Sequence, residues 1–186
     1  FVAAVLGRVD QDAGAHGRLP ALIAGCTVVV KPAPETPLDA MLLAEILADS
    51  DLPPGLVAIV PGGTEAGQRL VTHPDVDKIA FTGSSAVGRW IGAECGKRLA
   101  RCSLELGGKS AAIICADASL ERTVAGLKFS SFLNNGEACG AQTRVLAPRE
   151  RDDEIVDALA EMTTSLPVGD PDDTDTYIGP LVSARH

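Results

Sequence analysis

The sequence lacks the features that mark several large classes of protein. No apolar run approaches the roughly 18 residues that a membrane-spanning helix needs, and the first residues lack the basic-then-apolar pattern of a secretion signal. The five cysteines include no Cys-x-x-Cys pair, and the three histidines are far apart, so nothing supports a structural zinc site. An odd number of cysteines without a secretion signal favours reduced thiols in a cytoplasmic protein. We therefore predict no metal and no membrane association.

Basic clusters are also lacking, and the acidic excess is local. The net charge is −9, and residues 150–175 contain ten acids but only one base, Arg151. The rest of the chain has 15 acids and 15 bases. Without a basic stripe to neutralise phosphates, nucleic acid is not expected as a partner. The acidic segment is interpreted as a solvated helix face followed by a polar loop.

A hydrophobic content of 46% and a mean hydropathy of +0.17 indicate a soluble, globular protein. The chain starts at Phe1 rather than Met and stops at His186 with no terminating feature. We expect it to be an internal piece of a longer protein.

Strand and helix patterns alternate along the first part of the chain. Buried strands are predicted at residues 1–6, 27–31, 56–60 and 78–81, and helices at about 36–51, 64–71 and 85–99. Thr36 is the expected N-cap of the first of these helices, with Pro37 at the first helical position. Short connections between alternating elements imply parallel strands joined by right-handed crossovers. The fold class is therefore α/β, a doubly wound parallel sheet.

Such sheets bind ligands at the carboxyl ends of their strands. Lys31, Gly62-Gly63 and Thr82-Gly83-Ser84 fall at these ends. The helix after Ser84 could hold a pyrophosphate on its free N–H groups. However, Gly83 and Gly88 form a Gly-x4-Gly pattern rather than the Gly-x-Gly-x-x-Gly fingerprint, so an ordinary turn is an equal alternative.

The stretch from Glu105 to Cys139 carries a carboxylate at one end and a thiol at the other. A thiolate is a good covalent nucleophile, and a carboxylate can serve as a base for the thiol or for water. The alternative is a surface charge and a small core residue, because free cysteine is usually buried. Around this stretch, strands are predicted at 111–115 and 143–147, and helices at 120–132 and 152–164.

The sequence resembles the aldehyde dehydrogenase superfamily. The resemblance covers nearly everything from Leu19 to His186, and five segments in the right order and spacing carry it. They are Ala24-Gly-Cys-Thr-Val-Val-Val-Lys-Pro32, Asp77-Lys-Ile-Ala-Phe-Thr-Gly-Ser84, Leu104-Glu-Leu-Gly-Gly-Lys109, Phe132-Leu-Asn-Asn-Gly-Glu-Ala-Cys139 and Ile178-Gly-Pro-Leu-Val182.

The resemblance implies an NAD(P)-dependent oxidoreductase that converts an aldehyde to a carboxylic acid. Residues 1–106 would form part of a coenzyme-binding domain, and residues 107–186 the first part of an α/β catalytic domain. Cys139 matches the nucleophile that forms a thiohemiacetal and then a thioester. Glu105 matches the general base that activates water for thioester hydrolysis. The full-length parent is expected to be a homo-oligomer, with an aldehyde as its small-molecule partner.

The coenzyme implied is NAD or NADP. Lys31 matches the residue that contacts the adenosine ribose, and Ser84 the one that contacts pyrophosphate. Pro34 stands where NAD-specific members often carry an acid, so the choice between NAD and NADP stays open. The full set of expected coenzyme residues is Lys31, Gly63, Gly67, Phe81, Thr82, Gly83, Ser84, Val87, Gly88 and Leu106.

One segment departs from the family pattern. Family members follow the first strand with Pro-Trp-Asn, and that Asn is part of the oxyanion hole. Residues 7–18 contain no Pro, Trp or Asn, and losing one oxyanion donor costs about 10²–10³ in rate. A local reading-frame error, which resequencing the coding DNA would test, and real divergence towards an inactive form both explain the segment. A CoA-acylating relative is a third alternative, although Glu105 favours water as the acceptor.

Overall fold

The computed structural model describes the backbone of residues 2–7, 20–184 and 186, and side chains from residue 20 onwards. The departing segment at residues 7–18 therefore lies outside the described residues, apart from the backbone of Gly7. The chain divides into two compact units, residues 1–106 and 107–186. Among the described residues, no helix has the length and apolar character to cross a membrane.

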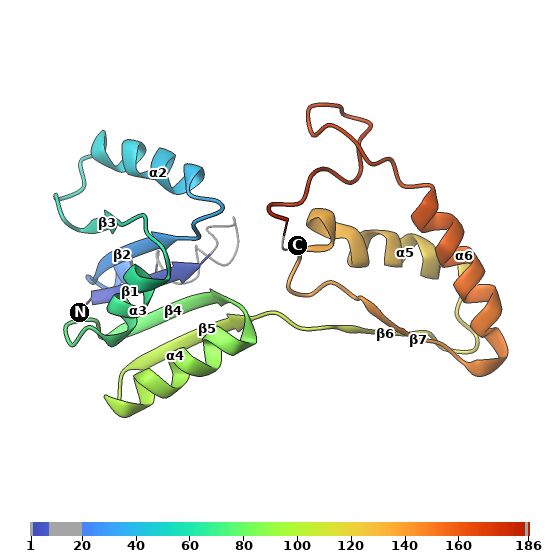
Figure 1. Cartoon of the computed structure of the whole chain (residues 1–186), viewed down its shortest axis with the longest axis horizontal. Helices are drawn as coiled ribbons and strands as arrows, with labels where there is room; N and C mark the ends of the chain where they lie inside the picture. The colour runs from blue at the N-terminus through green and yellow to red at the C-terminus, as the bar shows by residue number, and fades with distance from the viewer. Residues whose placement is uncertain (1, 8–19, 185) are drawn as a thin grey trace. The chain divides into compact units, whose positions relative to one another are not determined.

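Unit 1 is built on a five-stranded parallel sheet (Figure 1). The strand order is β3-β2-β1-β4-β5. The strands are β1 (Val2–Gly7), β2 (Thr27–Pro32), β3 (Val57–Ile59), β4 (Lys78–Gly83) and β5 (Arg101–Leu106). The chain first winds from β1 to β3 in one direction and then crosses back to β4, so the order reverses between β1 and β4. This is the doubly wound arrangement that the alternating pattern predicts.

Apolar residues cover both faces of this sheet. Ile79 and Phe81 of β4 belong to one cluster with α4, whereas Ala80 belongs to a second cluster with Val28 and Val30 of β2. Because successive side chains of a strand point to opposite faces, the two clusters lie on opposite sides. The helices of the unit are α2 (Leu38–Ala48), α3 (Thr64–Thr72) and α4 (Ser85–Lys97), and residues 20–23 form a further helical turn.

Three local expectations need correction. The N-cap of α2 is Pro37, not Thr36, and no side chain caps the helix. Thr36 instead closes a turn by donating its backbone N–H to the Ala33 carbonyl at 3.2 Å, which delays the helix by one residue. β4 continues to Gly83 instead of stopping at Phe81. β5 was not expected at all, and it pairs with β4 along the whole of its length.

Unit 2 is a smaller α/β arrangement. β6 (Ala111–Ile113) and β7 (Arg144–Leu146) pair in parallel, and α5 (Leu120–Phe132) forms the crossover between them. α6 (Asp152–Thr164) follows a short 3₁₀ turn, η2 (Arg149–Arg151). One apolar cluster, centred on Ile114, Leu127 and Ile155, joins the strands to both helices.

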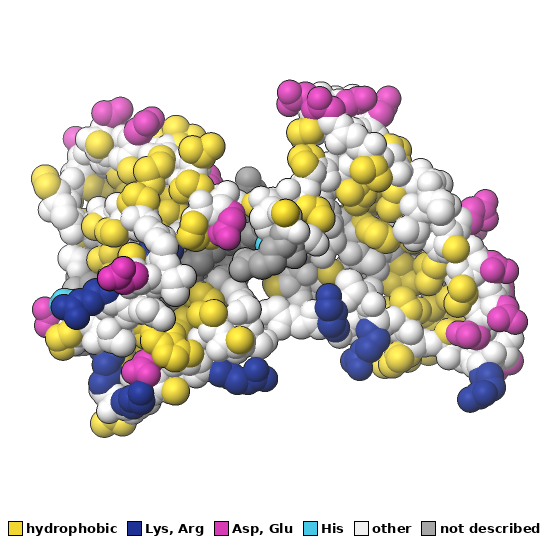
Figure 2. Space-filling view, in the orientation of Figure 1, with side chains coloured by type: hydrophobic (Ala, Val, Ile, Leu, Met, Phe, Trp, Pro, Cys, Tyr) yellow, Lys and Arg dark blue, Asp and Glu magenta, His cyan; other side chains and the backbone are white. Residues whose placement is uncertain are grey.

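The acidic segment has the structure expected for it. α6 carries acids on its exposed face, and the loop that follows contains the exposed residues Asp170, Asp172, Asp173 and Asp175. Figure 2 shows acidic side chains gathered over this loop. Asp170 and Asp173 each accept a backbone N–H from two residues further on, at 3.0 Å. Such local turns are a common role of aspartate in loops, and they account for two of the four carboxylates.

Candidate active site

The register of unit 1 aligns five of the ten predicted coenzyme residues at one edge of the sheet. Lys31 pairs with Leu6, which also pairs with Phe81, so these residues form one row across the strands. The next row contains Thr82 and Glu105. Because all five strands are parallel, these rows lie at the carboxyl edge, where doubly wound folds bind their ligands.

Lys31 is held at the end of β2 beneath α3. Its side chain is 7% exposed, and its ammonium donates a 2.8 Å hydrogen bond to the Pro32 carbonyl. A Cβ atom on Gly67 would lie 3.4 Å from the Lys31 side chain, so the glycine lets the helix pack against the lysine. Burial lowers the pKa of Lys31, and the charge of Glu35 acts in the opposite direction.

The amino end of α4 lies beside two apolar side chains. Ser84 is the N-cap, and its Oγ accepts the N–H of Val87 at 3.4 Å. The Phe81 ring covers Gly83, where a Cβ would lie 2.5 Å from the ring. Leu106 covers Gly88 in the same manner, also at 2.5 Å. A helix start with a partial positive charge thus lies beside two apolar side chains, which suits a phosphate joined to a flat ring.

The amino end of α3 offers a second approach to the backbone. Gly63 is its N-cap and has no side chain to occupy the position. A Cβ added there would meet no atom within 4 Å, so the space in front of this helix start is open within the described unit. Unit 1 therefore brings a buried lysine and two helix starts to the carboxyl edge of its sheet, which is where doubly wound folds bind phosphate-containing ligands.

Glu105 is exposed and lies one residue before the end of β5. Its register partner is Thr82, and both residues alternate with Phe81, Leu104 and Leu106, which face α4. Glu105 therefore points to the face opposite α4, at the same edge as the coenzyme candidates. This position leaves the carboxylate available to water.

Cys139 lies in unit 2, in an irregular segment between α5 and β7. Its side chain is exposed. The segment begins with three residues in the left-handed region: Asn134 at φ 54°, Asn135 at φ 56° and Gly136 at φ 75°. Asparagine and glycine are the residues that adopt this conformation most readily. The positive φ angles of the backbone before Cys139 thus explain why the sequence there is Asn-Asn-Gly.

Two sets of hydrogen bonds fix this segment. The Asn135 amide donates to the Pro180 carbonyl at 3.2 Å and accepts the Gly179 N–H at 3.0 Å. On the other side of Cys139, the carbonyl of Gln142 accepts the Ser131 hydroxyl at 2.7 Å, and its side-chain amide oxygen accepts that of Ser130 at 2.8 Å. The Cys139 segment is therefore clamped between the end of α5 and residues 179–180.

Replacing Asn135 by alanine is expected to loosen this clamp. The variant loses two hydrogen bonds and places alanine at positive φ, which together should lower the free energy of unfolding by about 2–4 kcal/mol. Asn134→Ala is the matched control, because Asn134 has a similar φ but no side-chain hydrogen bond in the described structure. Urea unfolding checks the difference, and equal losses in the two variants would contradict the role given to the Asn135 amide.

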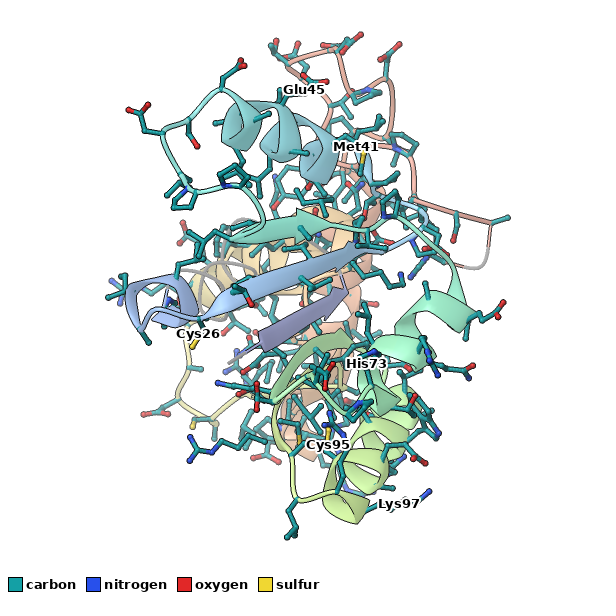
Figure 3. All side chains as sticks on the ribbon, turned by 90° about the vertical axis from the view of Figure 1, so that its left-hand side faces the viewer. Cys26, Met41, Glu45, His73, Cys95 and Lys97 are labelled. Carbon is teal, nitrogen blue, oxygen red and sulfur yellow. The ribbon has the colours of Figure 1, made fainter. Side chains whose placement is uncertain are left out.

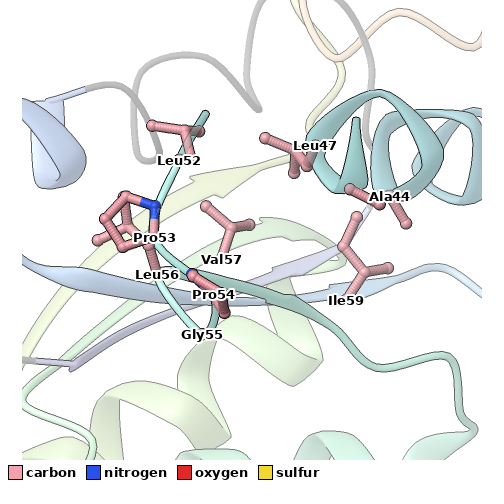
Figure 4. Close-up of a pocket in the computed structure, with 10 residues that line it drawn as sticks. Ala44, Leu47, Leu52, Pro53, Pro54, Gly55, Leu56, Val57 and Ile59 are labelled. Carbon is pink, nitrogen blue, oxygen red and sulfur yellow. The ribbon is translucent and has the colours of Figure 1, made fainter. Parts of the chain in front are cut away.

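The two surface pockets contain none of the predicted catalytic or coenzyme residues. An apolar pocket of about 330 Å³ lies between α2 and β3, lined by residues such as Leu47, Leu52 and Ile59 (Figure 4). It contains none of the predicted site residues and no titratable side chain. A second hollow of about 350 Å³ lies in unit 2 and reaches Ser130 and Gln142, which anchor the Cys139 segment.

A sequence model described as the aldehyde dehydrogenase family matches residues 14–186. The chain belongs to the aldehyde dehydrogenase family. The match begins before Leu19 and so includes part of the segment that departs from the family motif. Among curated aldehyde dehydrogenases, geranial dehydrogenase of Castellaniella defragrans is 52% identical over 167 residues, which cover 90% of this chain and 35% of that protein. Phenylacetaldehyde dehydrogenase of Pseudomonas fluorescens is 44% identical over 90% of this chain and 34% of its own length.

Solved structures that include an aldehyde dehydrogenase have the same fold. The Mycobacterium tuberculosis aldehyde dehydrogenase complexed with NAD+ matches with a TM-score of 0.92 and 49% identity, over 98% of this chain and 38% of that one. An NADP dependent enzyme of E. coli matches with a TM-score of 0.89 and 36% identity, over 99% and 39% of the two chains. The chain spans about a third of the length of the curated relatives it matches. The α/β fold and the family prediction are thereby confirmed.

Proposed function

We propose that the protein containing this chain oxidises an aldehyde to a carboxylic acid with NAD+ or NADP+. The observation that carries this proposal is the register of unit 1, in which Glu105 lies at the same edge as Lys31 and the start of α4. Unit 1 takes the role of the coenzyme-binding domain, and unit 2 contributes the nucleophile. Family membership supports both assignments.

Cys139 acts as the nucleophile. Its sulfur attacks the aldehyde carbonyl carbon to give a thiohemiacetal. The bound coenzyme supplies a hydride acceptor, and the enzyme is left as a thioester at Cys139. The exposed position of the thiol and its clamped segment support this role, because a nucleophile must be accessible and positioned.

Glu105 acts as the general base for the second half of the reaction. Its carboxylate takes a proton from water, the resulting hydroxide attacks the thioester carbonyl, and the Cys139 thiolate leaves. An exposed carboxylate at the edge of the sheet has access to that water. A carboxylate base in this position favours water over CoA as the acyl acceptor.

The test is a rapid-mixing measurement on the full-length protein, with residues 7–18 as they stand in this sequence. Geranial and phenylacetaldehyde serve as probes, since the relatives named above are described as acting on them. We expect a burst of NADH or NADPH equal to the concentration of active sites, followed by slower turnover. A protein that binds the coenzyme but gives no burst with either aldehyde would be the inactive form that the missing oxyanion asparagine suggests.

Pro34 is expected to leave the coenzyme choice relaxed, so that both NAD+ and NADP+ are used. It lies exposed in the turn from Ala33 to Thr36, close in sequence to Lys31. A carboxylate there would repel a ribose 2′-phosphate, so Pro34→Glu should raise the NAD+ to NADP+ ratio of kcat/KM by about tenfold or more. The control is Pro34→Gln, because glutamine has about the size of glutamate but no charge. An equal change in the kcat/KM ratio of this control would show that the charge is not the cause.

A further inference from the structure

Helix α4 and strand β5 run antiparallel to each other in close contact. A Cβ on Gly88 would lie 2.5 Å from Leu106, and a Cβ on Gly92 would lie 3.8 Å from Leu104. Four helical residues and two strand residues both advance the chain by about 6–7 Å. Moving four more residues along α4 and two residues back along β5 brings the last turn of α4, which contains Cys95, level with Cys102.

The two cysteines meet at that position. Cys95 packs in one apolar cluster with Ile79 and Leu104, and Cys102 is the strand partner of Ile79 on the same face of the sheet as Leu104. The backbone between them folds back tightly, because the Cys95 carbonyl accepts the N–H groups of Arg98 at 3.3 Å and Ala100 at 2.9 Å. Figure 3 shows Cys95 on α4, close to the carboxyl end of that helix, where Lys97 is also labelled.

The two thiols differ in their access to solvent. Cys95 is 1% exposed and packs in the core with Ile79 and Ile91, whereas Cys102 is exposed. A small oxidant in solution can therefore reach Cys102 but not Cys95. An accessible thiol beside a buried one is the arrangement in which a sulfenic acid is captured by a neighbouring thiol.

Arg98 provides a charge that assists this pair. Its Nη1 donates to the Val76 carbonyl at 2.7 Å, whereas its Nε and Nη2 are buried and have no acceptor in the part of the chain that the structure describes. Burial raises the pKa of the Cys95 thiol, and contact with Cys102 acts in the same direction, while the Arg98 guanidinium lowers it. A Cys95 thiolate would thus find a positive charge with unused N–H donors beside it.

We propose that Cys95 and Cys102 form a reversible oxidation site, in which hydrogen peroxide converts the two thiols into a disulfide that joins the end of α4 to the start of β5. Neither cysteine belongs to the catalytic or coenzyme residues, so the site is separate from the proposed dehydrogenase activity. The juxtaposition of an exposed thiol, a buried thiol and an arginine with unused donors carries the proposal.

The reaction balances in two steps. The Cys102 thiolate attacks one peroxide oxygen, an S–O bond forms, the O–O bond breaks, and the released hydroxide takes a proton to become water. The Cys95 sulfur, having lost its proton to solvent, then attacks the Cys102 sulfur. An S–S bond forms, the S–O bond breaks, and the second hydroxide leaves as water. Two thiols lose two electrons in total, and one peroxide gains them.

Tryptic mapping of the full-length protein tests this directly. Trypsin separates the two cysteines, because it cleaves after Arg89, Lys97, Arg101 and Lys109. After brief treatment with hydrogen peroxide and alkylation of the remaining thiols, we expect residues 90–97 linked to residues 102–109. The linked pair should be lost on reduction, and it should be much rarer when the protein is unfolded in urea before oxidation.

Two variants and a stability measurement complete the test. Cys102→Ala should leave Cys95 reduced and resistant to peroxide, whereas Cys115→Ala, which removes another exposed thiol, should leave the link intact. The oxidised protein should have a Tm a few degrees above that of the reduced protein, because the link closes a loop in the unfolded chain. Recovery of Cys102 as sulfinic acid with Cys95 still open to alkylation in urea would overturn the proposal. Because linkage is measured rather than activity, the result does not depend on the proposed function.

Discussion

Replacing Cys139 by alanine is expected to abolish aldehyde-dependent formation of NAD(P)H, with a loss in kcat of about 10⁴–10⁶. Alanine cannot form the thiohemiacetal, so the covalent route is closed, and only binding and orientation of the substrate remain. The measurement is the burst assay on the full-length protein, together with titration of coenzyme binding by fluorescence. Binding should be unchanged, because the predicted coenzyme residues belong to unit 1 whereas Cys139 belongs to unit 2.

Cys115→Ala is the matched control for this experiment. Cys115 is also exposed, lies in the same unit and comes two residues after the end of β6. It has no chemical role in the proposal, so its removal should leave the burst within about twofold of the unaltered protein, as is usual for a surface substitution. A burst that survives in Cys139→Ala but disappears in Cys115→Ala would show that Cys115, and not Cys139, is the nucleophile.

Replacing Glu105 by glutamine should separate the two halves of the reaction. Glutamine keeps the shape of the side chain but cannot take a proton from water. The first turnover should therefore still release NAD(P)H, while steady-state kcat falls by about 10²–10⁴. Rapid quenching followed by mass spectrometry should find an acyl group on Cys139, because the thioester accumulates when its hydrolysis is slow.

The same assay tests a control variant and two alternative interpretations of the role of Glu105. Glu94→Gln removes an acid from α4 that pairs with Lys97 at 2.6 Å, and it should leave steady-state kcat nearly unchanged. Loss of the burst in Glu105→Gln would show that this carboxylate is needed to activate the thiol. If added CoA raises turnover in both the unaltered protein and the variant, then CoA rather than water is the acyl acceptor.

Some elements could be predicted from the sequence because their signals are local. α5 and α6 occupy the predicted ranges, since each has a regular apolar spacing over three or more turns. β5 could not be predicted in this way. Its residues Arg101 to Leu106 alternate polar, small and apolar side chains at the edge of the sheet, and pairing with β4 decides their conformation. Glu105 thus lies on a strand that the local sequence does not reveal.

The candidate site was predictable in part for the same physical reason. The strand ends that carry Lys31, Thr82 and Ser84 follow from the alternation of elements, and the register aligns them at one edge. The contacts of Phe81 with Gly83 and of Leu106 with Gly88 depend on packing between a strand and a helix, which residue spacing does not determine. The roles of these residues, of Glu105 and of Cys139 stay predictions until the variants are measured.

The hydrogen bonds of Asn135 also determine the order in which parts of the chain can fold during synthesis. Its partners, Gly179 and Pro180, come 44 and 45 residues later in the chain. Domains fold as they leave the ribosome, with earlier residues first. The five described strands of unit 1 are all made once β5 has emerged, but the segment around Cys139 must wait until residues 179–180 are made. On the ribosome, the segment around Cys139 is therefore held in place only after the five described strands of unit 1 have been made.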